Sequence, residues 1–342
     1  MSGAAGAGAG AGAPAVLGEI DVVVHDARLV ASDVMLLELR AADGSMLPAW
    51  EPGAHLDVLV QPGVERQYSL CGDPGDLSHY LVAVLREPDG RGGSEHVHAH
   101  VAGGSALRIR GPRNHFPLVP PVAGASYLFV AGGIGITPLL PMVRAVEASG
   151  ASWRLAYAGR SLERMPFVDE LVTTFGSRVS VHTAEPGRRL DLAALEVPEG
   201  THVYACGPAR MLEELESVAA GAGAGAGSSG APWPSGALHL ERFEARSVAE
   251  PVRHESFEVE LELTGVTVTV PPDRSILDVV EEAGVLVLSS CREGTCGTCE
   301  TPVVSGEVDH RDSVLTPDEQ ASNEVMMICV SRAACPRLVL EL

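Results

Sequence analysis

The chain has 342 residues, 46% of them hydrophobic, and a formal net charge of −21 at pH 7. All 24 of its basic residues are arginine, which excludes lysine-based catalysis and a lysine-dependent phosphate loop. Nucleic acids and anionic membrane surfaces repel such an acidic chain, so neither is an expected partner. The length predicts two or three domains.

Residues 1–17 are predicted to form a disordered tail, because Gly and Ala dominate them. They lack the cationic start and the apolar core of a signal peptide. No apolar run along the chain reaches the length that spans a membrane. The seven cysteines are an odd number, which fits a reducing compartment better than a disulfide framework. We therefore expect a cytoplasmic protein.

Residues 18–122 contain short runs rich in strand-forming residues, separated by clusters of Pro, Gly and Asp. Several short strands at close spacing are typical of a small antiparallel β-barrel. The expected strands cover residues 20–25, 34–40, 56–60, 66–70, 80–85 and 106–110.

The pattern changes in residues 123–243, where strands alternate with helices, and this alternation predicts an α/β domain with a parallel sheet. The tract 219–230 consists mainly of Gly, Ala and Ser. We interpret it as a flexible insertion in a surface loop, because a turn and a last strand of the same domain follow it. The expected strands cover 127–131, 153–158, 179–182, 201–205 and part of 233–243, with helices ending near 148, 175 and 219.

Residues 244–255 are charged and contain Pro251, which predicts a linker. Residues 256–342 then begin with two alternating strands that form a hairpin around Gly265. A short helix, a cysteine-rich loop and a closing strand complete a small α+β, β-grasp-like domain. Its expected elements are strands over 257–263, 266–270 and 338–342 and a helix over 275–283.

Cysteines in this last domain follow the spacing C-x4-C-x2-C, and a fourth, Cys329, stands a long gap further on. This is the ligand run of a plant-type 2Fe–2S ferredoxin. Gly294 and Gly297 give the loop the freedom to point backbone N–H groups at the sulfurs. The alternative is a structural zinc site, but such sites usually have two short-spaced pairs. The three closely spaced candidate ligands are Cys291, Cys296 and Cys299.

A glycine-rich turn directly follows the apolar run 127–131 and opens a helix. Glycines let the backbone approach a pyrophosphate, and the N–H groups of a helix N-terminus bind anions. Thr137 is expected to cap this helix, and Pro138 to suit its first position. The turn lacks the G-x-G-x-x-G fingerprint and its acidic partner, and Arg160 stands there instead. Arg160 is either a contact for a 2′-phosphate, which leaves NADPH open, or a solvated arginine.

Two segments of the barrel are further candidates for the same site. Arg66, Tyr68 and Ser69 could hold a phosphate, cover a ring and bond a ring nitrogen, although strands alternate in any case. The segment 91–94 contains Gly92 and Gly93, and is either an anion-binding nest or a plain turn.

A second strand–turn–helix junction, Tyr204 to Pro208, faces the same edge of the parallel sheet, where ligands of such sheets bind. Cys206 in this junction is either a small packed residue or a group beside the reacting ring. His96, His98 and His100 in the barrel domain are interpreted as a solvated helix face rather than a metal site, because no carboxylate or thiol completes a ligand set.

These motifs, in this order, resemble the phthalate dioxygenase reductase family, which includes the vanillate O-demethylase reductases. The resemblance covers residues 18–342 and rests on the segments 66–71, 90–94, 131–138, 204–208 and 233–236 together with the cysteine run. It implies a barrel that binds FMN, a second domain that binds NADH and a third that carries the 2Fe–2S cluster. It also favours Cys329 over Cys335 as the fourth ligand.

The resemblance implies a role for each motif residue. Ser69 is expected to steady the flavin, and Thr137 and Cys206 are expected to orient the nicotinamide. Phe243 occupies the place of an aromatic residue near the flavin. The flavin set is Arg66, Tyr68, Ser69, Gly92, Gly93 and Ser94, and the nucleotide set is Gly132, Gly133, Gly135, Thr137, Pro138, Cys206, Gly207 and Pro208.

The resemblance therefore implies a reductase that passes electrons from NADH through FMN and the cluster to a Rieske-type aromatic oxygenase or O-demethylase. A haem-thiolate monooxygenase is the alternative acceptor. Two further alternatives are a redox-sensing iron–sulfur protein and a reductase that releases reduced FMN. The chain lacks the C-x-H pairs of a Rieske centre, so it is not expected to be the oxygenase itself.

Overall fold

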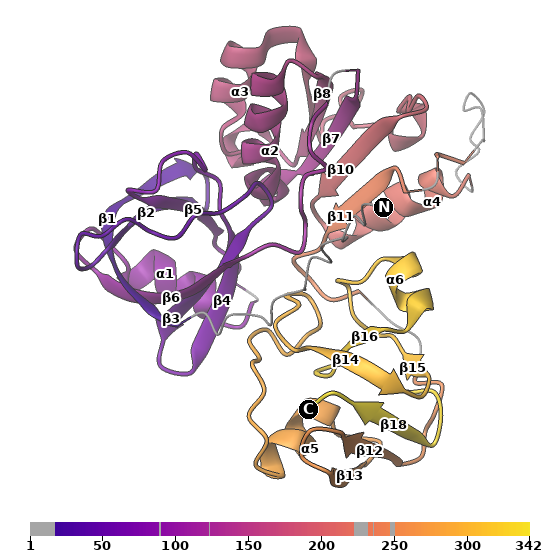
Figure 1. Ribbon diagram of the computed structural model, residues 1–342. Coiled ribbons are helices and arrows are strands. Elements are labelled where there is room, and N and C mark those ends of the chain that lie inside the picture. The colour runs from indigo at the N-terminus through magenta and orange to yellow at the C-terminus, as the bar shows by residue number, and fades with distance from the viewer. Residues whose placement is uncertain (1–17, 89, 123, 222–231, 235, 247–249) are drawn as a thin grey trace, which may run out of the picture.

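The computed structural model describes residues 18–88, 90–122, 124–221, 232–234, 236–246 and 250–342. The predicted tail over 1–17 lies outside the described residues, as do residues 222–230 of the predicted insertion and 247–249 of the predicted linker. Three separate sheets confirm the predicted fold class, and Figure 1 shows them as a barrel, an α/β unit and a small C-terminal unit. None of the described helices is long and apolar enough to cross a membrane.

The first unit is an antiparallel barrel in the order β4-β3-β6-β1-β2-β5. Alternation along β1 turns Val22 and Val24 into a core that the other strands also line. A bridge between Leu70 and Val82 brings the end of β4 back to β5 and closes the sheet. The elements are β1 (Ile20–Ala31), β2 (Val34–Ala41), β3 (His55–Gln61), β4 (Val64–Ser69), β5 (Tyr80–Leu85), α1 (Gly93–His100) and β6 (Ala106–Arg113).

The second unit is a parallel sheet in the order β11-β10-β7-β8-β9. Its central strand β7 is apolar throughout Tyr127–Ala131 because helices cover both faces of the sheet. β11 pairs in parallel with β10, so the last strand returns to the same sheet, as predicted. The elements are β7 (Ser126–Gly132), α2 (Ile136–Ser149), β8 (Ser152–Gly159), α3 (Val168–Phe175), β9 (Val179–Thr183), β10 (Thr201–Cys206), α4 (Ala209–Ala219) and β11 (Leu238–Glu241).

The third unit is a mixed sheet in the order β13-β12-β18-β14-β16, with a small ribbon of β15 and β17. The side chain of Ser275 caps α5 by accepting a hydrogen bond from the N–H of Asp278. A capping box between Thr316 and Glu319 starts α6. The elements are β12 (Phe257–Leu261), β13 (Val266–Val270), α5 (Ile276–Glu282), β14 (Glu300–Ser305), β15 (Val308–Asp309), α6 (Pro317–Ser322), β16 (Val325–Met327), β17 (Arg332–Ala333) and β18 (Arg337–Leu340).

The first two units share one apolar core, whereas the third keeps its own. Leu36 and Ala83 of the barrel belong to the same buried cluster as Ile136 and Leu139 of α2. The buried cluster of the third unit contains no residue before Phe257. The domain limits at residues 122, 243 and 255 stay predictions.

Candidate functional site

A cleft of about 1460 Å³ lies where the three units meet. The barrel contributes β4 and the segment before α1, and the α/β unit contributes the carboxyl ends of β7 and β10. Glu293, Thr295 and Cys296 of the third unit reach the same cleft. Ligands of parallel sheets bind beyond the carboxyl ends of the strands, so the cleft lies where the fold predicts a cofactor.

The barrel wall is built around the guanidinium of Arg66. Its Nη2 donates to the carbonyl of Arg91 at 2.7 Å, and burial lowers the pKa of Arg66. A Cβ atom on Gly93 would lie 2.6 Å from the Arg66 Nε, so glycine leaves room for the arginine. Gly92 has a φ of 78° and turns the chain into α1, while Ser94 accepts a hydrogen bond from the N–H of Glu87. A phosphate fits beside this cation and helix start.

Two polar groups of the barrel wall lack partners within the described part of the chain. The Tyr68 hydroxyl is buried, and burial raises its pKa. The Nε2 of His55, which also lines the cleft, is buried and unpaired as well. Buried polar groups normally have partners, so these two atoms fit a bound ring system that brings its own hydrogen-bonding groups.

Glycines bring the two strand-to-helix junctions of the α/β unit into contact. A Cβ atom on Gly135 would lie 2.2 Å from the carbonyl oxygen of Cys206. On Gly132 it would lie 2.6 Å from the Cδ of Pro208. Gly135 therefore lets the two junctions pack closely and form the floor of the cleft, but it does not line the cleft itself. The predicted nucleotide residues that do line it are Gly132, Gly133, Thr137, Gly207 and Pro208.

The predicted start of α2 was wrong in detail. A short 3₁₀ turn, Gly133–Gly135, precedes the helix, and Gly135 occupies the cap position without a side-chain hydrogen bond. Thr137 is the second helical residue and donates to the carbonyl of Ile134 at 2.9 Å, so it does not cap. Pro138 is the third helical residue rather than the first, and it is buried away from the cleft. Because the 3₁₀ turn already has helical geometry, the cap position of α2 lies at Gly135 and not at Thr137.

Ser69, Cys206 and Glu241 meet at the bottom of the cleft. The Ser69 hydroxyl lies 3.5 Å from Oε2 of Glu241, and the Cys206 thiol lies 3.9 Å from the same oxygen. Burial raises the pKa of Glu241 to about 8. Burial, together with Glu241, also raises the pKa of Cys206. Cys206 is completely buried, so it supports the floor of the cleft from behind.

Glu241 was not among the residues predicted from the sequence. It stands directly opposite Cys206 in the register of β10 and β11, but residues 207–237 separate these strands in the chain. A carboxylate at the carboxyl end of the last parallel strand was the available signal. Phe243, two residues further on, lines the cleft as expected and is 42% exposed. Arg160 lines it too, together with Arg189 and Arg210.

The cysteine-rich loop already has the form of a cluster site. The N–H groups of Glu293 and Thr295 each donate to the Cys291 sulfur at 3.4 Å. Gly294 and Gly297 have φ values of 70° and 71°, which glycine adopts without strain. The Thr298 hydroxyl lies 3.2 Å from the Cys296 sulfur. Such donors around the sulfurs are characteristic of iron–sulfur sites.

The four predicted ligands come together in one group. Cys291 contacts Cys296 and Cys329, and Cys329 also contacts Cys299. These contacts lower the pKa values of Cys291 and Cys299 and raise those of Cys296 and Cys329. Among the described residues, no three His, Cys, Asp or Glu side chains converge on one metal position. The C-x4-C-x2-C spacing with a distant fourth cysteine suits a cluster of two irons better than one tetrahedral zinc ion.

Cys335 lies apart from this set, with its sulfur 3.0 Å from the carbonyl of Arg337. The side chains of the three histidines of α1 contact the barrel or one another. His98 Nε2 contacts the carbonyl of Val84 at 2.9 Å, and the rings of His96 and His100 only approach one another.

Comparison with known proteins defines the class first. Residues 259–334 match the family described as the 2Fe-2S iron-sulfur cluster binding domain, which confirms the predicted cluster type. Together with the barrel and the parallel sheet, this domain makes the protein an electron-transfer oxidoreductase.

The chain belongs to the family of phthalate dioxygenase reductases and vanillate O-demethylase oxidoreductases. It is 39% identical over 331 residues to the phthalate dioxygenase reductase of Burkholderia cepacia, covering 95% of this chain and 98% of that one. It is 41% identical over 328 residues to a vanillate O-demethylase oxidoreductase of a Pseudomonas strain, covering 94% and 100%. The protein is therefore a reductase component of the oxygenase and demethylase type.

Two solved structures extend the comparison. A phthalate dioxygenase reductase, described as modular for electron transfer from pyridine nucleotides to [2Fe-2S], is 38% identical with a TM-score of 0.66, and the match covers 95% of this chain and 98% of that one. An intact type IV self-sufficient cytochrome P450 monooxygenase is 42% identical with a TM-score of 0.85. That match covers 95% of this chain but 41% of the cytochrome P450 chain.

Proposed function

We propose that this protein passes electrons from NADH, by way of FMN and a 2Fe–2S cluster, to a separate oxygenase. One observation carries the proposal. Most of the predicted flavin residues of the barrel, five of the predicted nucleotide residues of the α/β unit and the predicted cluster ligand Cys296 line the same cleft. Groups that exchange electrons must lie close together, and a single cleft satisfies this requirement for all three.

The barrel residues would hold the flavin. Arg66 and the start of α1 suit its phosphate, while Tyr68 and Ser69 suit its ring. A bound flavin supplies the exchange between the two electrons of a hydride and the single electrons of a cluster. The segment 91–94 closes the phosphate side, since Arg91 accepts a hydrogen bond from Arg66 and pairs with Glu293 at 3.0 Å.

The α/β unit would hold the nucleotide on the two joined junctions, with Gly132, Gly133 and Thr137 on one and Gly207 and Pro208 on the other. Ser69 and Glu241 stand where the nicotinamide would meet the flavin. Burial raises the pKa of Glu241 to about 8, which favours the protonated carboxyl at neutral pH. A protonated Glu241 would add no negative charge beside the reacting rings.

The cofactor content of the purified protein tests this proposal. We expect FMN to be released on denaturation, with about two irons and acid-labile sulfide per chain. NADH should reduce the protein, and a comparison with NADPH decides whether the arginines around the nucleotide select a 2′-phosphate. Absence of flavin or of labile sulfide would contradict the proposal. Sustained NADH turnover with an artificial acceptor would exclude a redox sensor. Flavin that stays bound during turnover would exclude a reductase that releases reduced FMN.

The similarity to the cytochrome P450 fusion favours a second candidate acceptor, a haem-thiolate monooxygenase. Both candidates use the same cleft and differ only in the protein that receives the electrons. Reconstitution with one purified oxygenase of each kind distinguishes them. We expect the Rieske-type partner to support faster substrate turnover, and faster turnover with the haem-thiolate partner would transfer the proposal to that class.

A further inference from the structure

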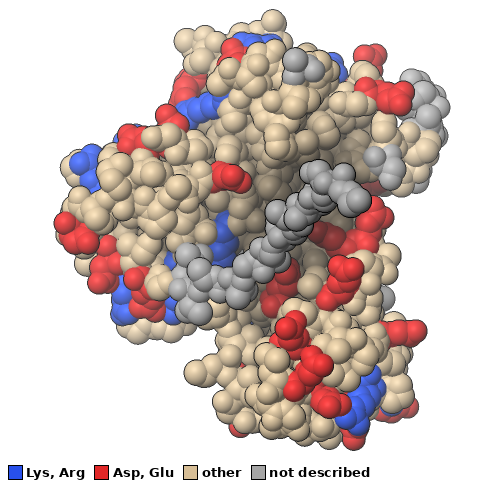
Figure 2. All heavy atoms as spheres, in the orientation of Figure 1, with Lys and Arg blue, Asp and Glu red and all other residues tan. Residues whose placement is uncertain are grey.

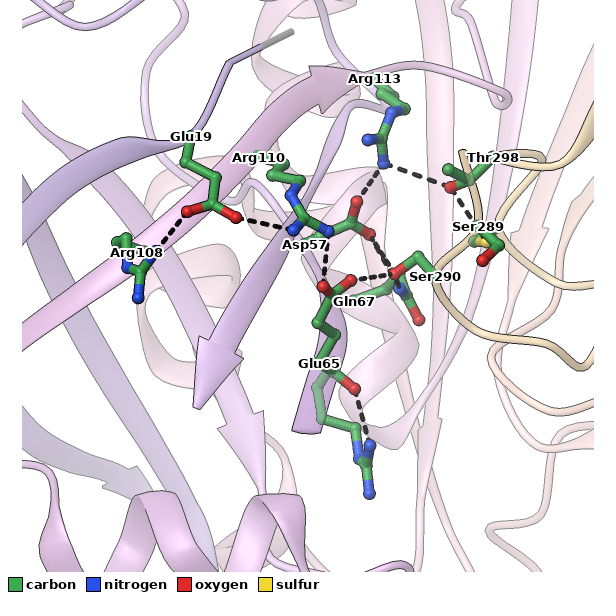
Figure 3. A network of polar contacts seen from close by, with 12 residues as sticks. Glu19, Asp57, Glu65, Gln67, Arg108, Arg110, Arg113, Ser289, Ser290 and Thr298 are labelled. Carbon is green, nitrogen blue, oxygen red and sulfur yellow. Dashed lines mark hydrogen bonds and ion pairs between the residues drawn. The ribbon is translucent and has the colours of Figure 1, made fainter. Parts of the chain in front are cut away.

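The third unit meets the barrel through a network of polar side chains, drawn in Figure 3. Ser290 and Thr298 of the cysteine-rich loop point into the outer face of the barrel. Ser290 directly precedes the first predicted ligand, and Thr298 lies between the second and the third. Any contact that holds these two residues therefore holds the cluster loop.

Ser290 is enclosed by three side chains from β3 and β4. Its hydroxyl accepts a hydrogen bond from the Gln67 amide at 2.5 Å. It also lies 3.1 Å from a carboxylate oxygen of Asp57 and 2.9 Å from one of Glu65, and can donate to either. Gln67 and Asp57 face each other across the two strands and are joined at 2.8 Å. The hydroxyl thus completes a network that the barrel has already assembled.

Thr298 is held through a buried ion pair. The Asp57 side chain is completely buried and pairs with Arg113 of β6. The same Nη1 atom of Arg113 donates to the Thr298 hydroxyl at 3.2 Å. Since that hydroxyl also contacts the Cys296 sulfur, one chain of contacts leads from the barrel to a ligand. His115 adds a steric contact, because a Cβ atom on Gly297 would lie 2.4 Å from its ring.

The interface between the barrel and the third unit differs in chemistry from the interface between the barrel and the α/β unit. An apolar core joins the barrel to the α/β unit, and such burial fixes the two units together. The third unit shares no buried apolar cluster with the barrel among the described residues. Polar contacts add little net stability, but they fix register and orientation. The ferredoxin-like unit is thus held in one orientation by directional bonds.

We propose that Asp57, Gln67 and Arg113 form a seat on the barrel that positions the cluster loop against the cleft. This inference rests on the proposed electron path and assigns positioning residues for its intramolecular step. The seat acts through Ser290 and Thr298, and none of its three barrel residues is a predicted cofactor contact. It explains why a buried charged pair lies on the outer face of a barrel.

The test weakens the contact between the seat and the loop by substitutions on either side of the interface. Ser290→Ala changes the loop, Gln67→Leu changes the barrel, and the double variant completes a thermodynamic cycle. Ser289→Ala is the matched control, because the Ser289 hydroxyl donates to Glu281 of its own unit at 3.5 Å. Two quantities are measured on the holoprotein. One is amide hydrogen exchange of residues 289–298, and the other is cluster bleaching after rapid mixing with NADH.

We expect exchange of the loop to become about fivefold faster in Gln67→Leu, which removes one hydrogen bond of about 1 kcal/mol. In Ser290→Ala, which also removes the hydrogen bond that Ser290 donates, exchange should become at least as fast. Cluster bleaching should slow, while flavin bleaching, the KM for NADH and the electron paramagnetic resonance spectrum of the chemically reduced cluster stay unchanged. The double variant should be no worse than the poorer single variant. Ser289→Ala should match the parent protein in both quantities.

The proposal would be wrong if both single variants showed the loop exchange rate and the cluster bleaching rate of the parent protein. It would also be wrong if Ser289→Ala changed these rates as much as the two single variants do. If Ser290→Ala lost its cluster, Gln67→Leu would carry the test, because it leaves the ferredoxin-like unit untouched. Failure of the proposed function is separately visible. In that case the parent protein itself would not pass electrons from NADH to the cluster, whereas hydrogen exchange would still report on the seat.

Discussion

At the residue scale, the cleft depends on a few side chains whose protonation is set by burial. Glu241 binds its proton more tightly when folded, because burial raises its pKa from 4.5 to about 8. Its stabilising contribution is therefore complete below about pH 4.5 and is lost as the pH rises through about 8.

Glu241→Gln should remove this pH dependence, because the amide stays neutral. We expect the melting temperature of the parent protein to fall between pH 5 and pH 9 and that of the variant to change less. Calorimetry across this range measures both. Glu262→Gln replaces an exposed carboxylate and serves as the control. Equal pH dependence of the parent and Glu241→Gln would show that the folded carboxyl is ionised at neutral pH.

Cys296→Ser should separate the two halves of the electron path. A serine hydroxyl is a poor replacement for a thiolate ligand, so reduction of cytochrome c should be abolished. NADH-driven reduction of ferricyanide needs only the flavin and should remain. Cys335→Ser should retain both activities, because Cys335 lies outside the group of four predicted ligands. Equal loss of both activities in Cys296→Ser would contradict the serial order.

Residues whose roles depend on local backbone chemistry could be predicted, and those whose roles depend on distant pairing could not. The ligand spacing and the glycine-rich turn are contiguous, so Cys291 and Gly132 were found from the sequence. Glu241 was missed because its place opposite Cys206 follows from the pairing of β10 with β11. Thr137 lines the cleft as expected, but the preceding turn removed its predicted capping role.

At the element scale, the contact between the junctions after β7 and β10 decides the shape of the nucleotide floor. Gly135→Ala should force these junctions apart, because its Cβ would lie 2.2 Å from the Cys206 carbonyl. We expect a loss of about 1–3 kcal/mol in the free energy of unfolding. NADH-dependent turnover should fall about tenfold or more, since small misplacements of reacting groups are costly.

Gly72→Ala is the matched control, because its nearest contact would be an ordinary 3.5 Å. Denaturation and steady-state kinetics measure both effects. Full turnover in Gly135→Ala with bound flavin would show that the two junctions do not act as one floor.

Elements with a strong period or a continuous apolar run were predicted well, among them β7 and the hairpin of β12 and β13. The short elements between the cysteine-rich loop and the closing strand were not predicted. α6 carried a usable signal, since Thr316, Pro317 and Glu319 form a capping box with proline at the helix start. β15 and β17 have two residues each and exist only through their mutual pairing, which no local pattern indicates.

At the scale of the whole molecule, charge is unevenly distributed. Residues 252–342 contain 17 acidic and 6 basic side chains. Figure 2 shows acidic side chains spread over the visible face of this unit. An acidic surface on this unit suits a partner with a basic patch, and salt screens such an attraction.

Oxygenase-coupled turnover should therefore fall severalfold between about 0.05 and 0.5 M salt, because screening shortens the reach of the charges. Ferricyanide reduction in the same solutions is the internal control and should change little. Coupled turnover that is independent of salt would contradict docking through the acidic unit.

The order of the three units followed from their motifs, but their arrangement did not. Nothing local in the sequence indicates that Ser290 would meet Asp57, which stands 233 positions earlier in the chain. Nor does local pattern show that the barrel joins one neighbour through an apolar core and the other through a polar seat.

We infer that one cleft serves all three cofactors in series. The decisive experiment is anaerobic mixing of the purified protein with NADH, followed at the absorbance bands of flavin and cluster. We expect the flavin to bleach first and the cluster to follow at a rate independent of protein concentration, as transfer within one molecule requires. A cluster that stays oxidised after the flavin is reduced, or bleaches only in proportion to protein concentration, would contradict it.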